Sequence, residues 1–285
     1  MKRFYKEVAV FASPLEGEAA SRSDAVGGVV VSDNTPPRNS LHEFRRSPAV
    51  AGSTLKGRVG FFILLDGKSA KTPARAPLAL PTRALAEAIA EEWRRQGESV
   101  RPQTMPLSKL ANSAIDRVAG REAEVAEQIL AYANDLLCYR AAAPAELVAR
   151  QNARWDPLLE WVAGRYAPLA VGTGIAHVPQ TDETLAAYRR ALAVHDAFAL
   201  AALHNAATVT GSLVLALALA EARLDARQAF ALSRLDEAFQ AEKWGADAEA
   251  ESRACALETE LVAAERFIRL AKHEPAGPHP STSSG

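Results

Sequence analysis

The feature that most limits how this chain can fold is its longest apolar stretch, which runs from Ala197 to Ala220. A helix over this stretch would nearly reach the length of a membrane span. The residues that interrupt it are His204, Asn205, Thr208, Thr210, Gly211 and Ser212. An apolar stretch with these polar groups is expected in the centre of a helical protein and not in a lipid bilayer. We therefore predict a buried core helix around 197–220 and no membrane insertion.

The sequence from Arg121 onward has an almost wholly helical pattern. Apolar residues recur at helical spacing, and one stripe consists of Val125, Ile129, Tyr132 and Leu136. Asp156, followed by Pro157, is expected to cap the start of a helix, because Asp is a common cap and Pro suits the first helical position. Two amphipathic helices, over roughly 226–245 and 247–271, complete the pattern.

Strand-like patterns are confined to the amino-terminal part. Residues 1–12 begin like a strand, and the apolar run 61–65 is followed by Asp66-Gly67, which favours a hairpin turn because both positions tolerate positive φ. A helix follows, with Leu85, Ile89 and Trp93 on one face. We predict an α+β fold, in which a small β-rich domain over 1–118 precedes an all-α helical bundle domain over 119–272.

Residues 13–59 break this pattern. They are rich in Ser, Gly, Pro and Arg without a sustained period, so we interpret them as a disordered insert in a loop. The insert opens with Pro14-Leu15-Glu16-Gly17 and closes with Thr54-Leu55-Lys56-Gly57, as a translated inverted DNA repeat would leave. A mobile element and an ordinary variable loop are both consistent with these ends, since long surface insertions cost little. The tail 273–285 is also predicted to be disordered.

Composition and motifs argue against several classes of function. A formal net charge of -1 and scattered arginines argue against nucleic-acid binding. The sequence has no nucleophile elbow, phosphate-binding loop, dinucleotide fingerprint or zinc-protease motif, and its histidines lack zinc-ligand spacing. We therefore predict no catalytic residues, no metal site and no cofactor. Cys138 and Cys255 are expected to be reduced, buried thiols.

The predicted helix over 226–245 is apolar on two faces. The face expected toward the core carries Leu232, Leu235 and Phe239. The opposite face carries Phe230, Ala241 and Trp244, with Glu237 between them. Because a carboxylate among aromatic side chains is costly to bury unpaired, Glu237 requires a partner. That partner is an arginine or a backbone donor, either within the chain, where Arg234 one turn earlier is the obvious candidate, or on another protein.

Other polar residues in mixed segments are interpreted as architecture. Asp135 and Arg140 lie in a segment of buried apolar residues, where we expect a structural pair, or else a polar lining of a groove. Trp155 and Asp156 are assigned to the helix start described above, and thus also to the structural residues.

Several segments, taken in order, carry a family resemblance. They are RFYKEV at 3–8, LLDGKSAKTP at 64–73, LPTRALAEAIAEEW at 80–93, MPLSKLANSAID at 105–116, YANDLLCYRA at 132–141, QNARWDPLLEW at 151–161, TGSLVLALAL at 210–219 and LDEAFQAEKWG at 235–245. Together they resemble the assembly factor that binds the alpha subunit of the ATP synthase F₁ sector (F₁ complex assembly factor two and its alphaproteobacterial relatives). Each segment alone is weak, and their number and order make the resemblance specific. The departure is the insert, because in relatives the first strand runs almost directly into the second.

The resemblance implies a two-domain protein that acts by binding, without ATP hydrolysis. It implies a chaperone that shields the surface of the free alpha subunit until the beta subunit covers it. It also implies a functionally sensitive acidic residue, Glu237 or Asp236, of which the two-face argument favours Glu237. The family's sensitive tryptophan matches Trp93, which we interpret as a core residue. The predicted partner-binding residues are Glu237, Asp236, Phe230, Ala241 and Trp244.

Two other hypotheses stay open at this point. A small-molecule-binding protein or enzyme would have a pocket between the domains, near Asp135, Arg140 and Glu237. A general holdase would protect unrelated proteins equally well. We favour the assembly chaperone and expect it to act as a monomer. We expect it in a bacterial cytoplasm, because the start MKRFYKEV has no signal-peptide pattern.

Overall fold

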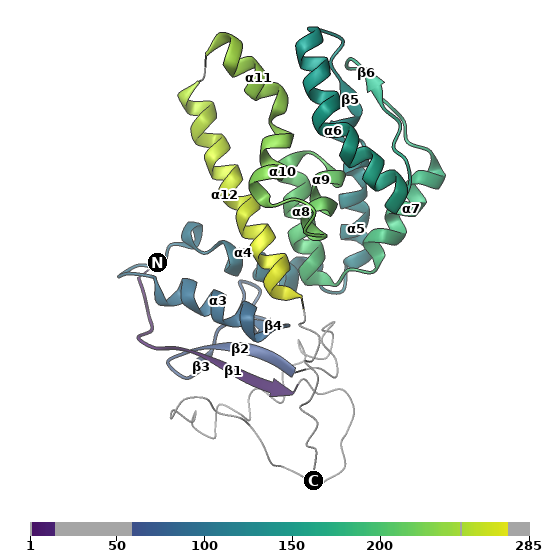
Figure 1. Ribbon diagram of the computed structural model, residues 1–285. Coiled ribbons are helices and arrows are strands. Elements are labelled where there is room, and N and C mark those ends of the chain that lie inside the picture. The colour runs from purple at the N-terminus through teal and green to yellow at the C-terminus, as the bar shows by residue number, and fades with distance from the viewer. Residues whose placement is uncertain (1, 15–58, 246, 273–285) are drawn as a thin grey trace, which may run out of the picture.

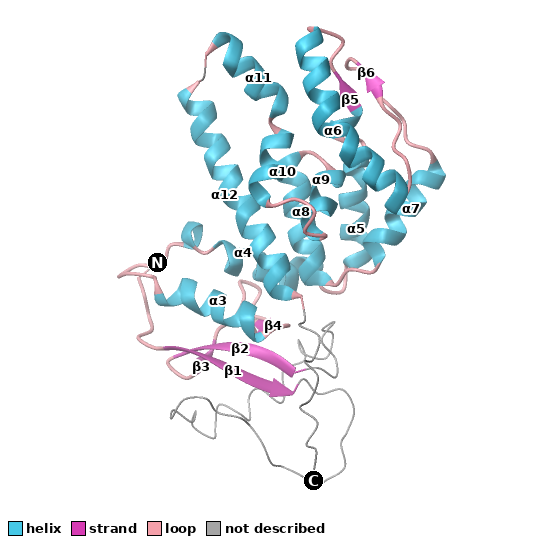
Figure 2. Ribbon diagram, viewed as in Figure 1, coloured by secondary structure: helices cyan, strands magenta, loops and turns pink. Residues whose placement is uncertain are grey.

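A computed structural model describes residues 2–14, 59–245 and 247–272 (Figure 1). A small sheet and the first helices form the lower part of the molecule in this view, and the other helices form the upper part (Figure 2). Strands therefore come first along the chain and helices follow, which confirms the predicted α+β class.

The amino-terminal sheet is antiparallel. Its strands are β1 (Val8–Pro14), β2 (Val59–Leu65), β3 (Lys68–Ser69) and β4 (Ala79–Leu80). In the pair of β1 and β2, Val8 lies opposite Leu65, and Pro14 lies opposite Val59. The turn Asp66-Gly67 connects β2 to β3 with φ of 48° and 75°, as predicted. The first strand starts at Val8, later than the sequence pattern indicated.

The ends of the predicted insert are held side by side by this strand pairing. β1 reaches Pro14 and β2 begins at Val59, so the two residues that flank the segment 15–58 are ladder partners. The segment itself lies outside the described residues. The insert therefore enters the chain at the end of a hairpin, where a turn of two residues would suffice.

We expect that replacing residues 15–58 by Asn-Gly leaves the fold intact. Asn-Gly favours the tight turn that joins paired strands, and closing a shorter flexible loop costs less, by roughly 2–3 kcal/mol at this length. The measurement is thermal unfolding by circular dichroism, with the full chain and a chain with a scrambled 15–58 as references. A shortened protein that is insoluble or has a lower Tm than the full chain would contradict this expectation.

Helix α3 (Arg83–Arg94) packs against the sheet, in contact with β1, β2 and β4. Thr82 caps its start as predicted, because Thr82 Oγ1 accepts a hydrogen bond from the backbone N–H of Leu85 at 3.1 Å. The side chain of Leu85 is fully buried beneath the helix. Helix α4 (Pro106–Ser113) follows and continues into a wider, π-helical turn over Ala114–Val118.

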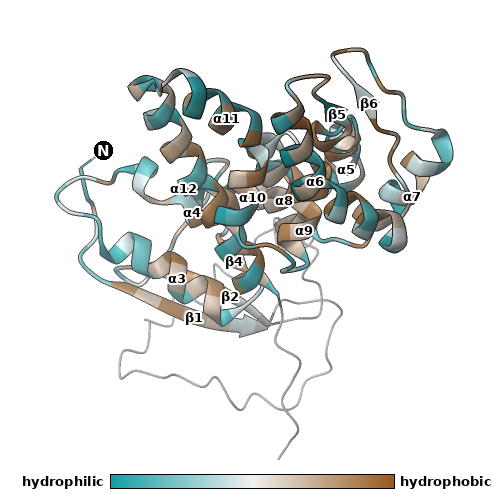
Figure 3. Ribbon diagram, turned by 45° about the horizontal axis from the view of Figure 1, so that its top comes forward, coloured by the Kyte–Doolittle hydropathy of each residue, from teal (hydrophilic) through white to brown (hydrophobic). Residues whose placement is uncertain are grey.

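The remaining helices form the carboxyl-terminal part. They are α5 (Glu122–Leu130), α6 (Ala145–Arg165), α7 (Asp182–Ala193), α8 (Ala197–Thr210), α9 (Leu213–Ala220), α10 (Ala226–Ser233), α11 (Leu235–Trp244) and α12 (Ala248–Ala271). A short parallel pair, β5 (Tyr139–Arg140) with β6 (Gly172–Thr173), accompanies them. Hydrophobic residues make up much of α8 and α9 (Figure 3), and both helices contact α10 and α12.

The buried stretch 197–220 forms two helices, so the prediction of one helix is wrong. Gly211 ends α8 in the left-handed conformation, with φ of 67°. The Ser212 side chain then caps α9 by accepting a hydrogen bond from the backbone N–H of Leu215. Residues that look like interruptions of one helix thus end the first and begin the second. No helix in the described parts of the chain is both long and apolar enough to cross a membrane.

The predicted helix over 226–245 is divided as well, at Arg234, where φ is −110° and ψ is 18°. The indole Nε1 of Trp155 donates to the carbonyl oxygen of Leu232 at 3.1 Å. In a continuous helix, this carbonyl would instead accept from the backbone N–H four residues later. As a result, Phe230 and Trp244 do not share a helix face. Phe230 is buried, contrary to its assignment to the partner-binding face, whereas Trp244 is exposed.

The prediction that a helix starts at Asp156 is wrong. α6 starts at Ala145 and passes through Pro157 without ending. Pro157 has no N–H, so the helix lacks one internal hydrogen bond at this point. The Asp156 side chain caps nothing and accepts instead from Arg140 Nη2 at 2.7 Å. Asp-Pro has the sequence signature of a helix start, but here Asp156 lies inside α6 and contacts Arg140.

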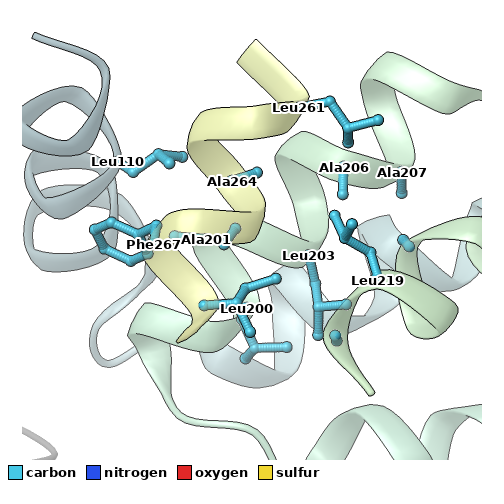
Figure 4. Packing of buried hydrophobic residues seen from close by; sticks show 14 of the residues in the cluster. Leu110, Leu200, Ala201, Leu203, Ala206, Ala207, Leu219, Leu261, Ala264 and Phe267 are labelled. Atoms are coloured by element: carbon cyan, nitrogen blue, oxygen red, sulfur yellow. The ribbon is translucent and has the colours of Figure 1, made fainter. Parts of the chain in front are cut away.

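One continuous core joins the sheet to the helices. α12 contacts α3 and α4 as well as α8, α9 and α10. Figure 4 shows Leu261, Ala264 and Phe267 of α12 among residues of the neighbouring helices. Thr82 Oγ1 also donates to the carbonyl oxygen of Leu270, which ties the start of α3 to the end of α12. The division into domains at residue 118 therefore stays a prediction.

The two cysteines have different environments. Cys138 is buried, and burial raises the pKa of its thiol to about 12. Cys255 is exposed on α12, so the prediction of two buried thiols is wrong for this residue. Both are free. The helical pattern of the sequence does not reveal that the Cys255 side chain is exposed to solvent.

Candidate functional site

Four segments that are distant in sequence meet in one hydrogen-bonded network. They are 132–141, 151–161, 210–219 and 235–245. Asp135 is fully buried in it, and its carboxylate accepts from Ser212 Oγ and from the backbone N–H of Val214, both at 2.9 Å. It accepts a third hydrogen bond, of 3.0 Å, from the backbone N–H of Leu137. Asp135 therefore fixes the start of α9 against the segment before β5.

Arg140 belongs to the same network but does not pair with Asp135. Its Nε donates to a backbone carbonyl oxygen at 2.9 Å, and its two terminal nitrogens donate to Asn152 Oδ1 at 3.0 Å and Asp156 Oδ1 at 2.7 Å. The guanidinium group also lies over the Trp155 ring, 5.3 Å from the ring centroid. The predicted Asp135–Arg140 pair is therefore wrong, because each residue has other partners.

Gln151 connects this network to α11. Its Oε1 accepts from the backbone N–H of Ala141 at 2.8 Å, and its Nε2 donates to Asp236 Oδ1 at 2.7 Å. Gln151 is fully buried, and both of its hydrogen bonds are partly shielded from water. Asp236 thus holds α11 against α6. The sequence pattern did not indicate this link, because an uncharged amide gives no sign of its partner.

Glu237 lies beside Asp236 but has a different environment. Its Oε1 is 2.8 Å from Arg234 Nη1, and the two side chains are 49% and 35% exposed. The internal ion pair that we considered as one alternative is therefore present, and such a surface pair contributes about 0–1 kcal/mol. Of the two acidic residues, Asp236 is engaged between helices, whereas Glu237 is accessible from solvent.

Ion pairs along α11 strengthen its contact with α6. Arg150 Nη1 lies 2.8 Å from Glu242 Oε1, and Lys243 Nζ lies 2.8 Å from Glu146 Oε2. The guanidinium group of Arg150 also lies 5.1 Å from the ring centroid of the buried Phe239. These contacts hold one face of α11 against α6 and leave its other face open to solvent.

Residues 240–260, which we call the arm, project from the bundle as a helical hairpin (Figure 1). None of its described residues is buried, and α12 enters the core only at Leu261. Trp244 at the end of α11 is 79% exposed, and Ala241 is half-buried. A half-buried apolar stripe on α12 consists of Ala250, Ala254 and Leu257. Ala254 and Leu257 of this stripe pack partly against the core, so the large apolar side chain that the arm offers to solvent is Trp244.

Trp93 lies at the end of α3, in the amino-terminal part. Its ring meets the ring of Tyr5 edge to face, with 5.6 Å between centroids, and the Tyr5 hydroxyl donates to the Trp93 carbonyl oxygen at 2.7 Å. Trp93 is partly buried against the core. These contacts tie the first residues of the chain to α3, and the core role expected of Trp93 stays a prediction.

A cavity of about 310 Å³ lies between Pro81 and residues of α8, α9 and α12. Its lining is mainly apolar, and it does not include Asp135, Arg140 or Glu237, the residues considered for a small-molecule site. The described residues contain no group of three or more His, Cys, Asp or Glu side chains that could hold a metal ion. Of the polar residues singled out in the sequence, Asp135, Arg140, Asp156 and Asp236 contact other segments of the chain, whereas Glu237 forms a surface pair with Arg234.

Comparisons with known proteins match this arrangement. The sequence model of the ATP12 chaperone protein family matches residues 47–163. The crystal structure of Atp12 from Paracoccus denitrificans is 38% identical in sequence and aligns over 95% of this chain and 98% of that chain, with a TM-score of 0.75. A putative chaperone from Agrobacterium tumefaciens is 44% identical over 75% of this chain and 81% of that chain, with a TM-score of 0.72. The mitochondrial protein atp12 of Schizosaccharomyces pombe is 27% identical over 223 residues, which cover 73% of this chain and 75% of that protein.

The chain has an α+β fold with an inward-facing polar network and an arm that exposes Trp244, and its relatives place it among the chaperones. The chain belongs to the ATP12 chaperone protein family. The family resemblance noted in the sequence is thereby confirmed.

Proposed function

We propose that this protein is an assembly chaperone of ATP synthase that binds the free alpha subunit of F₁ and releases it to the beta subunit. The observation that carries this proposal is the arm, with its exposed Trp244 and its half-covered apolar stripe. Family membership supports a chaperone, and the sequence resemblance supplies the alpha subunit as the client. We also propose that the protein acts as a monomer in the bacterial cytoplasm.

The properties of the arm suit a client that is held and then released. A subunit surface that waits for its neighbour is apolar and prone to aggregation, so a chaperone needs apolar groups to cover it. A few large side chains supply most of the binding energy at such interfaces, and tryptophan is frequent among them. A small hairpin with one exposed tryptophan can provide protection without the permanence of a large obligate interface.

Co-expression with the alpha subunit, followed by size-exclusion chromatography, is expected to yield a soluble complex. We expect Trp244→Ser to weaken binding at least about tenfold, since loss of an interface tryptophan commonly costs about 2 kcal/mol or more. The side chain is mostly exposed in the free protein, so Tm should stay within a few degrees. Titration calorimetry with purified alpha subunit measures the affinity.

Ile175→Ser is the matched control, because Ile175 is fully exposed and lies outside the arm. It should leave the affinity unchanged. Glu237→Lys reverses the charge of the accessible acidic residue and removes its pair with Arg234, and we expect weaker binding by a folded protein. An alpha subunit that aggregates regardless of this protein, or equal losses with Trp244→Ser and Ile175→Ser, would refute the proposal.

A further inference from the structure

A depression of about 730 Å³ lies between the end of α3, the loop after it and α12. Three arginines line it: Arg95 at the end of α3, Arg101 in the loop and Arg266 on α12. We call it the basic depression. Its lining includes no residue of the arm. Arginines from separate segments thus gather at one place in a chain whose formal net charge is -1.

The loop that carries Arg101 is held in shape by partly buried hydrogen bonds. Gln96 is buried, and its side chain accepts from the backbone N–H of Arg101 at 2.7 Å and donates to Thr104 Oγ1 at 3.1 Å. Arg3 reinforces the loop, because its Nη1 donates to the Gln96 carbonyl oxygen at 2.7 Å and its N–H donates to the Glu98 carbonyl oxygen at 2.8 Å. A backbone that is already ordered loses little entropy when a ligand binds.

The arginines of the basic depression keep most of their donors free. Arg101 and Arg266 are exposed, and neither side chain forms an ion pair or a hydrogen bond within the described parts of the chain. Arg95 pairs with Glu91 of its own helix at 2.9 Å. The carboxylate of Glu92, which also lines the depression, accepts from two backbone N–H groups and a hydroxyl at the start of α4, and it attracts the charge of the nearby Arg266 without a hydrogen bond to it. The exposed guanidinium groups of Arg101 and Arg266 therefore keep hydrogen-bond donors available at a formed concave surface.

The chemistry of this surface favours carboxylates on a protein. Guanidinium groups bind carboxylates through paired, charge-assisted hydrogen bonds. A nucleic acid requires a longer continuous basic surface, and here Glu92 and Glu98 lie among the basic residues that line the depression. Separate arginines on separate segments fit an acidic stretch of polypeptide, in which each carboxylate is carried on its own side chain.

We propose that the basic depression binds an acidic segment of the same client that the arm contacts, so this inference rests on the proposed function. The arm carries six acidic and two basic residues between positions 240 and 260. The two surfaces thus differ in charge, and α12 contributes to both. Complementary charges of this kind steer and orient a partner during encounter. The basic depression gives the client one orientation on the chaperone, and the arm covers its apolar surface.

The test uses the full chain, a labelled octaglutamate peptide and the purified alpha subunit. Arg101→Ser/Arg266→Ser is expected to weaken peptide binding at low salt by about tenfold. The same variant should slow association with the alpha subunit about fivefold and change dissociation little, because steering acts on the association rate. Arg190→Ser/Arg227→Ser removes two exposed arginines from other helices. This control is expected to change neither the affinity for the peptide nor the association rate with the alpha subunit.

The outcomes separate this inference from the proposed function. An unchanged association rate, or equal weakening of peptide binding by both variant pairs, overturns the inference while the complex with the alpha subunit stands. Tighter binding of an oligothymidylate of equal length than of octaglutamate overturns it in favour of nucleic acid. Absence of any complex with the alpha subunit overturns the proposed function and, with it, the assignment of the acidic segment to that client.

Discussion

Asp135→Ala is expected to lower the free energy of unfolding by about 3–6 kcal/mol at pH 7, because three buried donors lose their acceptor at about 1–3 kcal/mol each. These donors are the Ser212 hydroxyl and the backbone N–H groups of Val214 and Leu137. Their loss releases the start of α9 at the centre of the helical part. Urea unfolding followed by circular dichroism measures the change.

A matched control and a pH series sharpen this prediction. Asp225 caps α10 at the surface, and Asp225→Ala should cost only about 1 kcal/mol. Burial raises the pKa of Asp135 to about 6, above that of an aspartate in an unfolded chain. The folded state therefore binds this proton more tightly, and the stability from Asp135 declines as the pH rises from about 4 to 6. We expect Asp135→Ala to lower the free energy of unfolding more at pH 4.5 than at pH 7.5. A loss no greater than that of Asp225→Ala would show that the network is not needed for stability.

Phe267→Ala should cost about 3–5 kcal/mol, as is usual for a buried phenylalanine. Phe267 has no exposed surface, and its ring stacks on Phe198 with 6.2 Å between centroids. Val262 provides the control on the same helix, since it is 40% exposed and Val262→Ala should cost about 0.5 kcal/mol. Chemical unfolding of the three proteins under one set of conditions gives both differences.

The same experiment tests whether the two predicted domains unfold independently. α12 contacts α3 and α4 of the amino-terminal part and α8, α9 and α10 of the carboxyl-terminal part. We therefore expect Phe267→Ala to shift one common transition, seen alike by tryptophan fluorescence and circular dichroism. Two separate transitions, of which only the one from the carboxyl-terminal part shifts with the substitution, would instead support independent domains divided at residue 118.

The parts of the fold that could be predicted depend on short-range signals. Asp66-Gly67 defines a turn because of its backbone preferences, and Thr82 caps α3 because its hydroxyl reaches the N–H of Leu85, three residues away. In each case the partner lies within a few positions along the chain. The alternating apolar residues of strands and the apolar stripes of helices are also short-range signals, and they were sufficient to predict the α+β class.

The parts that could not be predicted depend on a partner distant in sequence. The break after α10 lies where the Leu232 carbonyl accepts a hydrogen bond from Trp155, which is 77 positions away. Asp156 resembles a cap, but it accepts from Arg140 and lies inside α6. The prediction of the partner-binding face failed for the same reason. The break between α10 and α11, which separates buried Phe230 from exposed Trp244, has no signal in the local sequence pattern.

The different exposure of the two cysteines makes the arm a natural place for a chemical reporter. The chain has two cysteines, and the one on α12, Cys255, lies within the arm. Cys138 is buried, and its raised pKa keeps it as an unreactive thiol at neutral pH. A maleimide dye will therefore attach to the arm alone in the wild-type sequence. Docking of a client can then be followed from the one surface that the proposal concerns, without changing a single residue.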